Sequence, residues 1–258
     1  MRVQELFDLS GKVAIVTGGG SGLGRQMAEA LAECGADLVL CARRADRCEE
    51  AAQELAGLGV RALGLACDVR NPEDVDAVVR RAVAELGRVD ILVNNAGTAW
   101  GAPPEDMPLD GWQKVLDVNL TGLFLFAQTV GRVLIEQGDG GRIVNVASVA
   151  AFRGAPQAAM NAIPYNASKA GVVGLTIDLA VKWAQHGITV NAIAPGWFPS
   201  EMTKHTLDAA GDRLLGRVPL GRYGGPDDLK GAVVYLSSAA SAYVTGTTLV
   251  VDGGQMAS

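Results

Sequence analysis

The residues best suited to chemistry in this chain are a tyrosine and a lysine four positions apart, Tyr165 and Lys169. A phenol can donate a proton to an oxygen that gains negative charge, but its ordinary pKa of ~10 is too high for a base at neutral pH. At this spacing both side chains share one face of a helix, so the ammonium group of Lys169 can favour the phenolate. The pair therefore indicates proton transfer to or from an oxygen atom.

A glycine-rich turn far upstream has the composition of a phosphate-binding loop. Glycine permits positive φ angles and close approach of the backbone to a pyrophosphate, and a helix starting at the turn offers free N–H groups to the phosphates. The spacing differs from the Gly-x-Gly-x-x-Gly fingerprint, so a plain tight turn stays open as an alternative. The turn consists of Thr17, Gly18, Gly19, Gly20, Ser21, Gly22, Leu23 and Gly24.

Two arginines stand where NAD and NADP are distinguished. Arg43 comes 19 residues after Gly24 (43 − 24) and is followed by Arg44, at the expected end of the second strand. An acidic residue there would bind the ribose 2′-hydroxyl of NAD, whereas a guanidinium group suits a 2′-phosphate. The pair favours NADP, with NAD as the alternative if both arginines are merely solvated at a helix entrance.

The composition describes an ordered, acidic protein. Hydrophobic residues make up 49% and charged residues 19% of the 258 residues, and the formal net charge is −6. The apolar content is enough for a sizeable core, and the negative charge argues against a nucleic-acid partner. The sequence contains no secretory signal and no run of 18 apolar residues, so we expect a cytoplasmic protein with no membrane partner.

The four cysteines, at positions 34, 41, 48 and 67, form no Cys-x-x-Cys motif. The two histidines, His186 and His205, lie far from all of them in the sequence. We therefore expect the cysteines to be small buried side chains in a reducing compartment, and we expect no metal site.

Short apolar runs alternate with helical patterns along the whole chain. Several of the runs lack polar alternation, which is typical of strands covered on both faces. Alternation of this kind implies right-handed crossovers and a parallel, doubly wound α/β sheet, and no linker interrupts it, so residues 1–258 are predicted to form one domain. The predicted strands are Val13–Thr17, Asp37–Ala42, Ala62–Cys67, Ile91–Asn94, Arg142–Ala147, Thr189–Ala194 and Thr248–Val251. The predicted helices are Gly24–Cys34, Asp46–Leu58, Pro72–Glu85, Gly111–Glu136, Tyr165–His186 and Pro226–Ala239.

Two segments interrupt this rhythm and are predicted to be loops, residues 150–164 and residues 195–220. Loops of such length in a compact domain usually have a function or are mobile. Both follow the carboxyl ends of predicted strands, where ligands bind in open α/β sheets. We therefore expect them to border the substrate, with a plain surface excursion as the alternative.

The order of these features resembles the classical short-chain dehydrogenase/reductase family over nearly the whole chain. The motifs that carry the resemblance are the glycine turn, Asp68-Val69, Asn94-Asn95-Ala96-Gly97, Asn119, Ser148, Tyr165-x-x-x-Lys169, Pro195-Gly196 and Asp252-Gly253-Gly254. The resemblance implies a single-domain Rossmann-type fold of about seven strands with helices on both faces. It also implies an NAD(P)-dependent oxidoreductase that transfers a hydride between nicotinamide and a ketone or secondary alcohol.

The resemblance assigns roles to individual residues. Asn119, Ser148, Tyr165 and Lys169 would be catalytic, with Asn119 holding a water for proton relay, Ser148 bonding the substrate oxygen and Lys169 also bonding the nicotinamide ribose. The implied cofactor-binding residues are Gly18, Ser21, Gly22, Leu23, Gly24, Arg43, Arg44, Asp68, Val69, Asn95, Ala96, Gly97, Tyr165, Lys169, Pro195, Gly196, Phe198 and Ser200. Asp68 and Val69 would contact the adenine, and the Phe198 backbone and Ser200 hydroxyl would lie near the carboxamide.

The substrate is less well defined by the sequence. The segment from Ala194 to Thr203 resembles the gluconate 5-dehydrogenase branch, and 3-oxoacyl reductases look similar. Trp197 and Met202, with Met160, are candidate substrate residues; the apolar side chains favour an apolar substrate or simply close over the nicotinamide. Ser148 and Tyr165 are 17 residues apart (165 − 148), more than the dozen or so common in the family, so an unusual pocket wall is expected between them.

Two other functional classes stay open. A dinucleotide-binding sensor or scaffold protein would need the glycine turn but no proton donor, and an epimerase or dehydratase of the same fold would usually carry a larger C-terminal substrate domain. The helix that begins near Tyr165 is apolar on nearly all sides and includes the small residues Ala170, Gly171 and Gly174. A helix of this kind is usually buried on two faces, and the family resemblance implies a homotetramer, or a homodimer.

Overall fold

The strands predicted from the sequence form one sheet in which every neighbouring pair is parallel. The computed structural model describes residues 1–154 and 161–258. The strand order is β3-β2-β1-β4-β5-β6-β7, so the chain reverses its direction of winding between β1 and β4. The strands are β1 (Val13–Thr17), β2 (Asp37–Ala42), β3 (Ala62–Ala66), β4 (Ile91–Asn94), β5 (Gly141–Val146), β6 (Ile188–Pro195) and β7 (Thr248–Val251).

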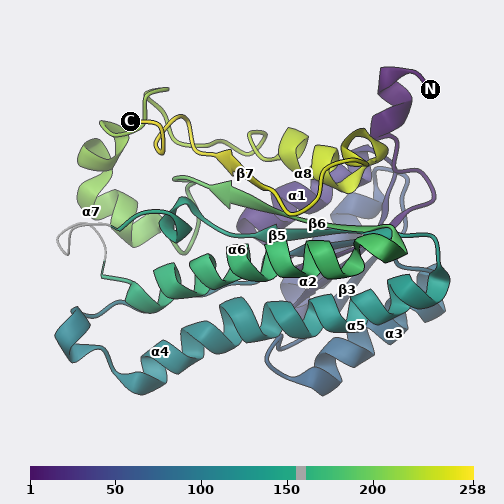
Figure 1. Cartoon of the computed structure of the whole chain (residues 1–258), viewed down its shortest axis with the longest axis horizontal. Helices are drawn as coiled ribbons and strands as arrows, with labels where there is room; N and C mark the ends of the chain where they lie inside the picture. The colour runs from purple at the N-terminus through teal and green to yellow at the C-terminus, as the bar shows by residue number, and fades with distance from the viewer. Residues whose placement is uncertain (155–160) are drawn as a thin grey trace.

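Helices cover both faces of this sheet (Figure 1). They are α1 (Gly22–Glu33), α2 (Ala45–Ala56), α3 (Pro72–Leu86), α4 (Leu109–Leu116), α5 (Gly122–Gln137), α6 (Ile163–Trp183), α7 (Lys204–Leu215) and α8 (Lys230–Ser237). Apolar residues of α1, α2 and α8 pack on one face, and those of α3, α5 and α6 pack on the other. The predicted Rossmann-type, doubly wound α/β fold is confirmed.

Strand β1 explains why the buried strands read as continuous apolar runs. Val13 and Ile15 pack with the helices of one face, whereas Ala14 and Val16 pack with those of the other. Successive side chains of a strand point to opposite faces, and here both faces are covered, so none of the four is more than 1% exposed. Burial on both sides thus removes the polar alternation that a half-exposed strand would show.

Local signals set the ends of helix α3, which the sequence analysis predicted over Pro72–Glu85. The Asn71 side chain accepts a hydrogen bond from the backbone N–H of Glu73 at 3.0 Å, and Pro72 occupies the first helical position. At the other end Gly87 adopts a left-handed conformation with φ of 90°. Capping asparagine, first-turn proline and terminal glycine each satisfy or avoid an unpaired backbone group at the helix end.

The single helix predicted over Gly111–Glu136 is interrupted in the structure. Helix α4 passes into a π-helical turn, Asp117–Thr121, before α5 begins. A π-turn inserts one extra residue into the helical hydrogen-bond ladder and is frequent at functional sites. The hydropathy period does not reveal it, because the helix axis continues through the turn.

By length and composition the segment Leu109–Gln137 could cross a membrane, with 44% of its most apolar window buried inside the protein; core helices pass the same criterion.

Two further predictions need correction. Residues 195–220 were predicted to be a loop, but they contain helix α7, whose Leu214 is only 4% exposed; the helix has too few apolar residues to give a clear period. Helix α8 begins at Lys230, since residues 226–229 form turns, and not at Pro226. In the other predicted loop, a short 3₁₀ helix spans Val149–Ala151 and α6 begins at Ile163. The rest of that loop includes Met160, which lies outside the described residues.

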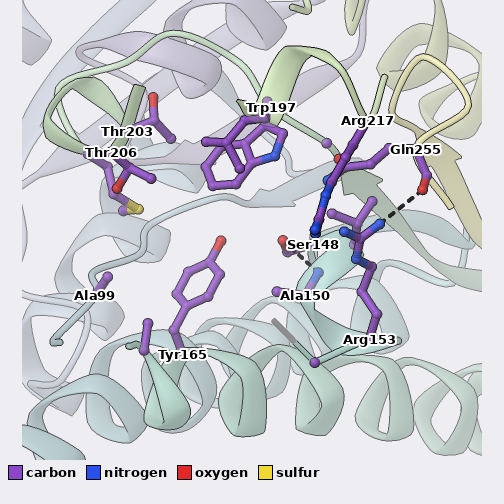
Figure 2. A pocket seen from close by; sticks show the side chains of 16 residues that line it. Ala99, Ser148, Ala150, Arg153, Tyr165, Trp197, Thr203, Thr206, Arg217 and Gln255 are labelled. Carbon is purple, nitrogen blue, oxygen red and sulfur yellow. Dashed lines mark hydrogen bonds between the residues drawn. The ribbon is translucent and has the colours of Figure 1, made fainter. Parts of the chain in front are cut away.

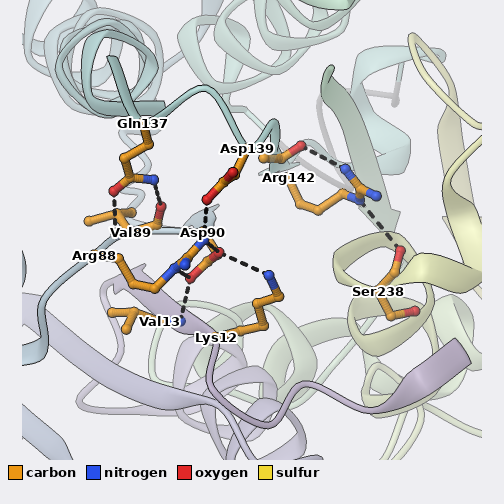
Figure 3. A network of polar contacts seen from close by, with 10 residues as sticks. Lys12, Val13, Arg88, Val89, Asp90, Gln137, Asp139, Arg142 and Ser238 are labelled. Carbon is orange, nitrogen blue, oxygen red and sulfur yellow. Dashed lines mark hydrogen bonds and ion pairs between the residues drawn. The ribbon is translucent and has the colours of Figure 1, made fainter. Parts of the chain in front are cut away.

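A polar network that the sequence did not reveal joins the amino ends of three strands (Figure 3). The buried carboxylate of Asp90 accepts hydrogen bonds from Lys12 at 3.2 Å, from the Val13 N–H at 3.0 Å and from Arg88 at 2.7 and 2.8 Å. Nearby, the guanidinium group of Arg142 donates to the backbone carbonyl oxygens of Gly141 and Ser238. This network lies at the end of the sheet opposite to the one described next, and it gives the buried carboxylate of Asp90 the charged and hydrogen-bonded partners that a buried charge requires.

Candidate active site

A groove runs along the carboxyl ends of the strands where the winding reverses, the place where open α/β sheets bind ligands. It consists of two adjoining cavities of about 360 and 350 Å³. The predicted cofactor-binding residues that line it are Gly18, Ser21, Gly22, Leu23, Arg43, Arg44, Asp68, Val69, Asn95, Ala96, Gly97, Tyr165, Lys169, Pro195, Gly196, Phe198 and Ser200. Gly24 lies behind this lining. The groove therefore brings together segments that are far apart in the sequence.

The glycine turn supplies the floor of the groove. Gly18 and Gly22 have φ of 66° and 54°, values that other residues rarely adopt. A Cβ atom on Gly24 would lie 2.3 Å from the carbonyl oxygen of Gly18, so only glycine lets α1 start this close to the turn. Because α1 begins at Gly22, its free N–H groups face the space where a pyrophosphate would bind.

Strand β4 is tied to the glycine turn by side-chain hydrogen bonds. The hydroxyl of Thr17 accepts from the backbone N–H groups of Asn95 at 2.9 Å and Ala96 at 3.0 Å. In return, the side-chain amide of Asn95 donates to the carbonyl oxygens of Thr17 at 3.0 Å and Gly18 at 3.3 Å. These bonds fix the segment 95–97 beside the turn. The sequence motif indicated Asn95, but not the matching role of Thr17.

The two arginines after β2 differ in their environment. Arg44 forms an ion pair with Asp46 at 2.7 Å. The side chain of Arg43 has no hydrogen bond or ion pair with any residue that the structure describes, and its charge contributes to the lowered pKa of Asp68 after the larger effect of Arg70. Arg43 is therefore the guanidinium group left available to a ligand at this end of the groove.

Ser148 and Tyr165 stand at the other end of the groove. Ser148 follows β5 and begins the short helix Val149–Ala151, and its hydroxyl accepts a hydrogen bond from the Ala150 N–H at 3.1 Å. Tyr165 lies in the first turn of α6, where Pro164 is pre-set for a helix start. Burial raises the pKa of the Tyr165 phenol, and a hydrogen bond with Ser148 lowers it in part. From the sequence we expected the neighbouring groups to lower the Tyr165 pKa. That expectation is wrong for the protein without a cofactor, because desolvation of the phenol raises the pKa by more than the hydrogen bond lowers it.

Lys169 lies one helical turn after Tyr165, as the i, i+4 spacing predicts. Its ammonium nitrogen is 5.7 Å from the centroid of the Tyr165 ring and donates a hydrogen bond to the carbonyl oxygen of Val146 at 2.6 Å. The side chain is buried in the protein, and this burial lowers the Lys169 pKa to about 8. A lysine that is buried with a single carbonyl partner is rare unless it has a function.

Asn119 lies in the π-helical turn and is completely buried. Its side-chain oxygen accepts from the Thr98 N–H at 2.8 Å, and its amide donates to the Thr98 carbonyl oxygen and the Ser168 hydroxyl, each at 3.0 Å. The Ser168 hydroxyl donates in turn to the carbonyl oxygen of Tyr165 at 2.7 Å. Asn119 therefore connects the segment after β4 to the helix of Tyr165, while a water held for proton relay stays a prediction.

A second buried chain of amides was not found from the sequence. The Asn94 side chain donates to Asn145 at 3.0 Å, and Asn145 donates to the Thr176 hydroxyl at 3.0 Å. This chain crosses β4, β5 and α6 beneath the groove. Asn94 stood in a recognised motif, whereas nothing in the sequence distinguished Asn145 or Thr176 from other polar residues.

The segment after β6, residues 195–203, forms one wall of the groove. The Thr203 hydroxyl donates to the carbonyl oxygen of Phe198 at 2.7 Å and lies 3.0 Å from the hydroxyl of Ser200. The Phe198 ring is buried and packs against Gly224, where a Cβ atom would come within 2.2 Å of it. Glu201 reaches across to Arg47 of α2 at 3.0 Å. Thr203, Gly224 and Arg47 were not expected from the sequence.

A separate cavity of about 160 Å³ opens from the groove at Ser148 and Tyr165 (Figure 2). Two predicted substrate residues, Trp197 and Met202, line it. Most of its remaining lining residues belong to 150–154, 161–164 and 195–220, parts of the two segments that the sequence analysis expected to border the substrate. The remaining lining residues with polar side chains are Arg153, Thr203, Thr206, Arg217 and Gln255. Within residues 1–154 and 161–258, no group of three or more His, Cys, Asp or Glu residues could hold a metal ion.

Comparisons with known proteins agree on the family. Residues 18–256 match the family model described as enoyl-(acyl carrier protein) reductase. The chain is 43% identical to 2-dehydro-3-deoxy-D-gluconate 5-dehydrogenase of Dickeya dadantii over 97% of this chain and 98% of that protein. A short-chain type dehydrogenase/reductase from Mycobacterium marinum superposes with a TM-score of 0.95 at 41% identity, covering 100% of both chains.

A third similar structure was solved with ligands. It is a gluconate 5-dehydrogenase from Burkholderia cenocepacia in complex with NADP and tartrate, with a TM-score of 0.94, 38% identity and 100% coverage of both chains. The sheet, the groove at its switch point and these full-length matches lead to one conclusion: the chain belongs to the short-chain dehydrogenase/reductase family of oxidoreductases.

Proposed function

We propose that the protein transfers a hydride between NADP and a ketone or secondary alcohol, with Tyr165 as the general acid and base. The observation that carries this proposal is that Ser148 and Tyr165 line both the groove and the adjoining cavity. A carbonyl group that enters from the cavity therefore meets a dinucleotide in the groove at these two hydroxyls.

The protein residues have complementary tasks in such a reaction. Hydride addition leaves negative charge on the carbonyl oxygen, so donors must be in place before the charge develops. The Ser148 hydroxyl can donate a hydrogen bond to this oxygen, and Tyr165 can donate the proton. The raised pKa of Tyr165 keeps the phenol protonated at neutral pH, which suits it to the donor role. Lys169 and Asn119 hold the helix of Tyr165 and the neighbouring backbone in place.

The groove residues fit a nicotinamide dinucleotide, which supplies or accepts the hydride when bound. The positive φ angles of Gly18 and Gly22 let the backbone turn at the start of α1, which leaves the first N–H groups of this helix free for a pyrophosphate. Arg43 has no side-chain partner among the described residues and suits a 2′-phosphate. The relatives add support, since the similar gluconate 5-dehydrogenase was solved with NADP. These observations favour NADP over NAD.

The decisive experiment compares the wild-type protein with Tyr165→Phe in NADPH oxidation over a panel of ketones. We expect turnover to fall by about 10²- to 10⁴-fold, the usual contribution of a general acid. NADPH should still raise the melting temperature of Tyr165→Phe by as much as that of the wild-type protein. Tyr243→Phe, the same change at a fully exposed tyrosine, is the matched control. A sensor or scaffold protein would show no turnover with either protein, and net NADPH consumption separates a reductase from an epimerase that recycles its cofactor.

We further propose that the chain self-associates, as a homotetramer or a homodimer, in the cytoplasm. Ile177 and Val181 of α6 are 50% and 75% exposed, and Phe124 of α5 is 38% exposed. These apolar side chains favour burial against another copy, and the four free cysteines suit a reducing compartment. Sedimentation equilibrium that gives a monomer mass would overturn the assembly, and cell fractionation tests the location.

A further inference from the structure

The described residues that line the cavity beside Ser148 and Tyr165 carry two positive charges and no negative charge. Arg153 and Arg217 line it, and no aspartate or glutamate does so among the described residues. The chain as a whole is acidic, with a formal net charge of −6. A cavity with this charge is therefore a local exception that needs a physical reason.

The two guanidinium groups reach the same end of the cavity from different elements (Figure 2). Figure 2 shows Arg153 and Arg217 pointing toward each other near Ser148. Arg153 donates one hydrogen bond to the carbonyl oxygen of Gln255 at 2.9 Å, which fixes the side chain and leaves other N–H groups available. Arg217 makes no side-chain hydrogen bond or ion pair with any described residue.

Bringing two like charges together is unfavourable unless an opposite charge lies between them. Arg153 comes from the segment after β5, and Arg217 follows α7. The two residues are far apart in the sequence, so chain connectivity does not require their side chains to lie together. A planar carboxylate can accept paired N–H groups from a guanidinium in a fixed geometry. An anionic ligand would convert the repulsion between the two arginines into two attractive contacts.

Two further residues that line this cavity have a buried polar atom without a hydrogen-bond partner among the described residues. These atoms are the indole N–H of Trp197 and the side-chain oxygen of Gln255. Buried polar groups are normally paired, so a ligand with both donor and acceptor groups would satisfy them. The sequence favoured an apolar substrate because of Trp197, but its buried N–H points instead to a ligand oxygen.

We propose that the substrate is a hydroxy acid or keto acid whose carboxylate is bound by Arg153 and Arg217. Its reacting carbon lies at Ser148 and Tyr165, and a further oxygen accepts from the Trp197 N–H. In oxidation Tyr165 first releases its own proton to solvent; the carbon then loses a hydride to NADP⁺, the hydroxyl proton passes to the Tyr165 phenolate, and the carboxylate is unchanged. This inference rests on the proposed function, which it narrows to an anionic substrate class.

The test compares acids with their uncharged amides, using the holoenzyme with saturating NADP⁺. The probes are D-gluconate with D-gluconamide and 5-hydroxyhexanoate with 5-hydroxyhexanamide. We expect at least one acid to exceed its amide in kcat/KM, and Arg217→Gln to lower that value by about 10- to 100-fold, mainly through KM, because a hydrogen-bonded charge contact is lost. The amide should change by less than about 3-fold, since it made no charge contact.

Three variants sharpen the result. Arg217→Lys should restore part of the preference for the acid, because it keeps the charge but not the bidentate geometry. Arg80→Gln removes an exposed arginine of α3 and should leave both probes unaffected. Trp197→Phe should lower kcat/KM for D-gluconate by a few fold and leave 5-hydroxyhexanoate unchanged, because only the polyol offers an extra oxygen.

Failure of this inference can be distinguished from failure of the proposed function. Reduction of cyclohexanone with NADPH reports hydride transfer to an uncharged substrate, and calorimetric titration of each acid and amide into the NADP-bound protein reports binding without turnover. Equal binding of acid and amide, binding of neither, or a preference for a phosphate ester overturns the carboxylate site whatever cyclohexanone does. Absence of turnover with every probe counts against the proposed function, while the binding ratio still decides the carboxylate site.

Discussion

The groove and the cavity beside it are built in opposite ways. In the groove and directly behind it, three polar side chains are already bonded to the protein: Asn95 to the glycine turn, the buried Asn119 to the segment after β4, and Lys169 to a strand carbonyl. In the cavity, Arg217, the Trp197 indole and the Gln255 side-chain oxygen have no partner among the described residues. The groove is therefore organised before a ligand arrives, whereas the cavity leaves its polar atoms for a substrate to satisfy.

This difference separates stability from specificity. Side chains that bond to the protein stabilise the fold and keep the cofactor site in shape without any ligand. Unpaired side chains contribute little to stability, or reduce it, and gain their partners only on binding. Substitutions in the two regions should therefore have different signatures in unfolding and in kinetics.

The largest expected effect is on stability in the groove. Asn119→Ala removes three hydrogen bonds and leaves the Thr98 N–H and its other partners buried, at a cost of about 3 kcal/mol or more. Trp197→Phe removes an indole N–H that has no partner among the described residues, so the free energy of unfolding should change by less than about 1 kcal/mol. Urea denaturation of both proteins without ligand measures the two values. Equal destabilisation would break the contrast between groove and cavity.

The second effect is a pH dependence that originates in Lys169. Because burial lowers its pKa to about 8, the folded protein binds fewer protons than the unfolded chain between pH 8 and the ordinary lysine pKa. Stability therefore rises with pH in this window, by up to about 3 kcal/mol. Burial raises the pKa values of Tyr165 and of the Cys48 thiol, and the pKa of the buried Cys41 thiol is raised as well. These groups act in the opposite direction at higher pH.

The contribution of Lys169 is isolated by comparison with Lys169→Met. Urea denaturation from pH 7 to 9.5 gives the unfolding free energy of each protein. As the pH rises, the unfolding free energy of the wild-type protein should increase relative to that of Lys169→Met. A difference that is independent of pH would show that Lys169 keeps an ordinary pKa, which would contradict its burial as the dominant cause.

The smallest effect concerns the two arginines at the adenosine end of the groove. Arg43→Gln should weaken NADPH binding by about 10-fold or more and leave NADH unchanged, because a charge-assisted hydrogen bond to the 2′-phosphate is lost. Arg44→Gln should change NADPH affinity only about 3-fold at most, since its guanidinium group is held by Asp46. Tryptophan fluorescence titration gives both affinities. A larger loss in Arg44→Gln would reverse this assignment.

The sequence predicted the groove better than the cavity because the main residues of the groove are set by local geometry. The glycine turn, Asn95 and the Tyr165–Lys169 pair are each set by local geometry: a positive φ, a strand end, one helical turn. Their positions in space follow once the alternating order of strands and helices fixes a parallel sheet. The π-helical turn at Asn119 and helix α7 were missed, because neither changes the apolar pattern strongly.

The sequence by itself determined the doubly wound sheet, the position of the phosphate-binding turn and the order of the residues that resemble a dehydrogenase. Only the tertiary structure decided that Arg44 has a partner while Arg43 has none among the described residues, and that burial raises the Tyr165 pKa. It also decided that Arg153, Trp197, Arg217 and Gln255 meet in one cavity. The physical reason is that burial, charge and hydrogen bonding at these residues depend on segments far away in the chain. Local patterns carry no information about such distant neighbours.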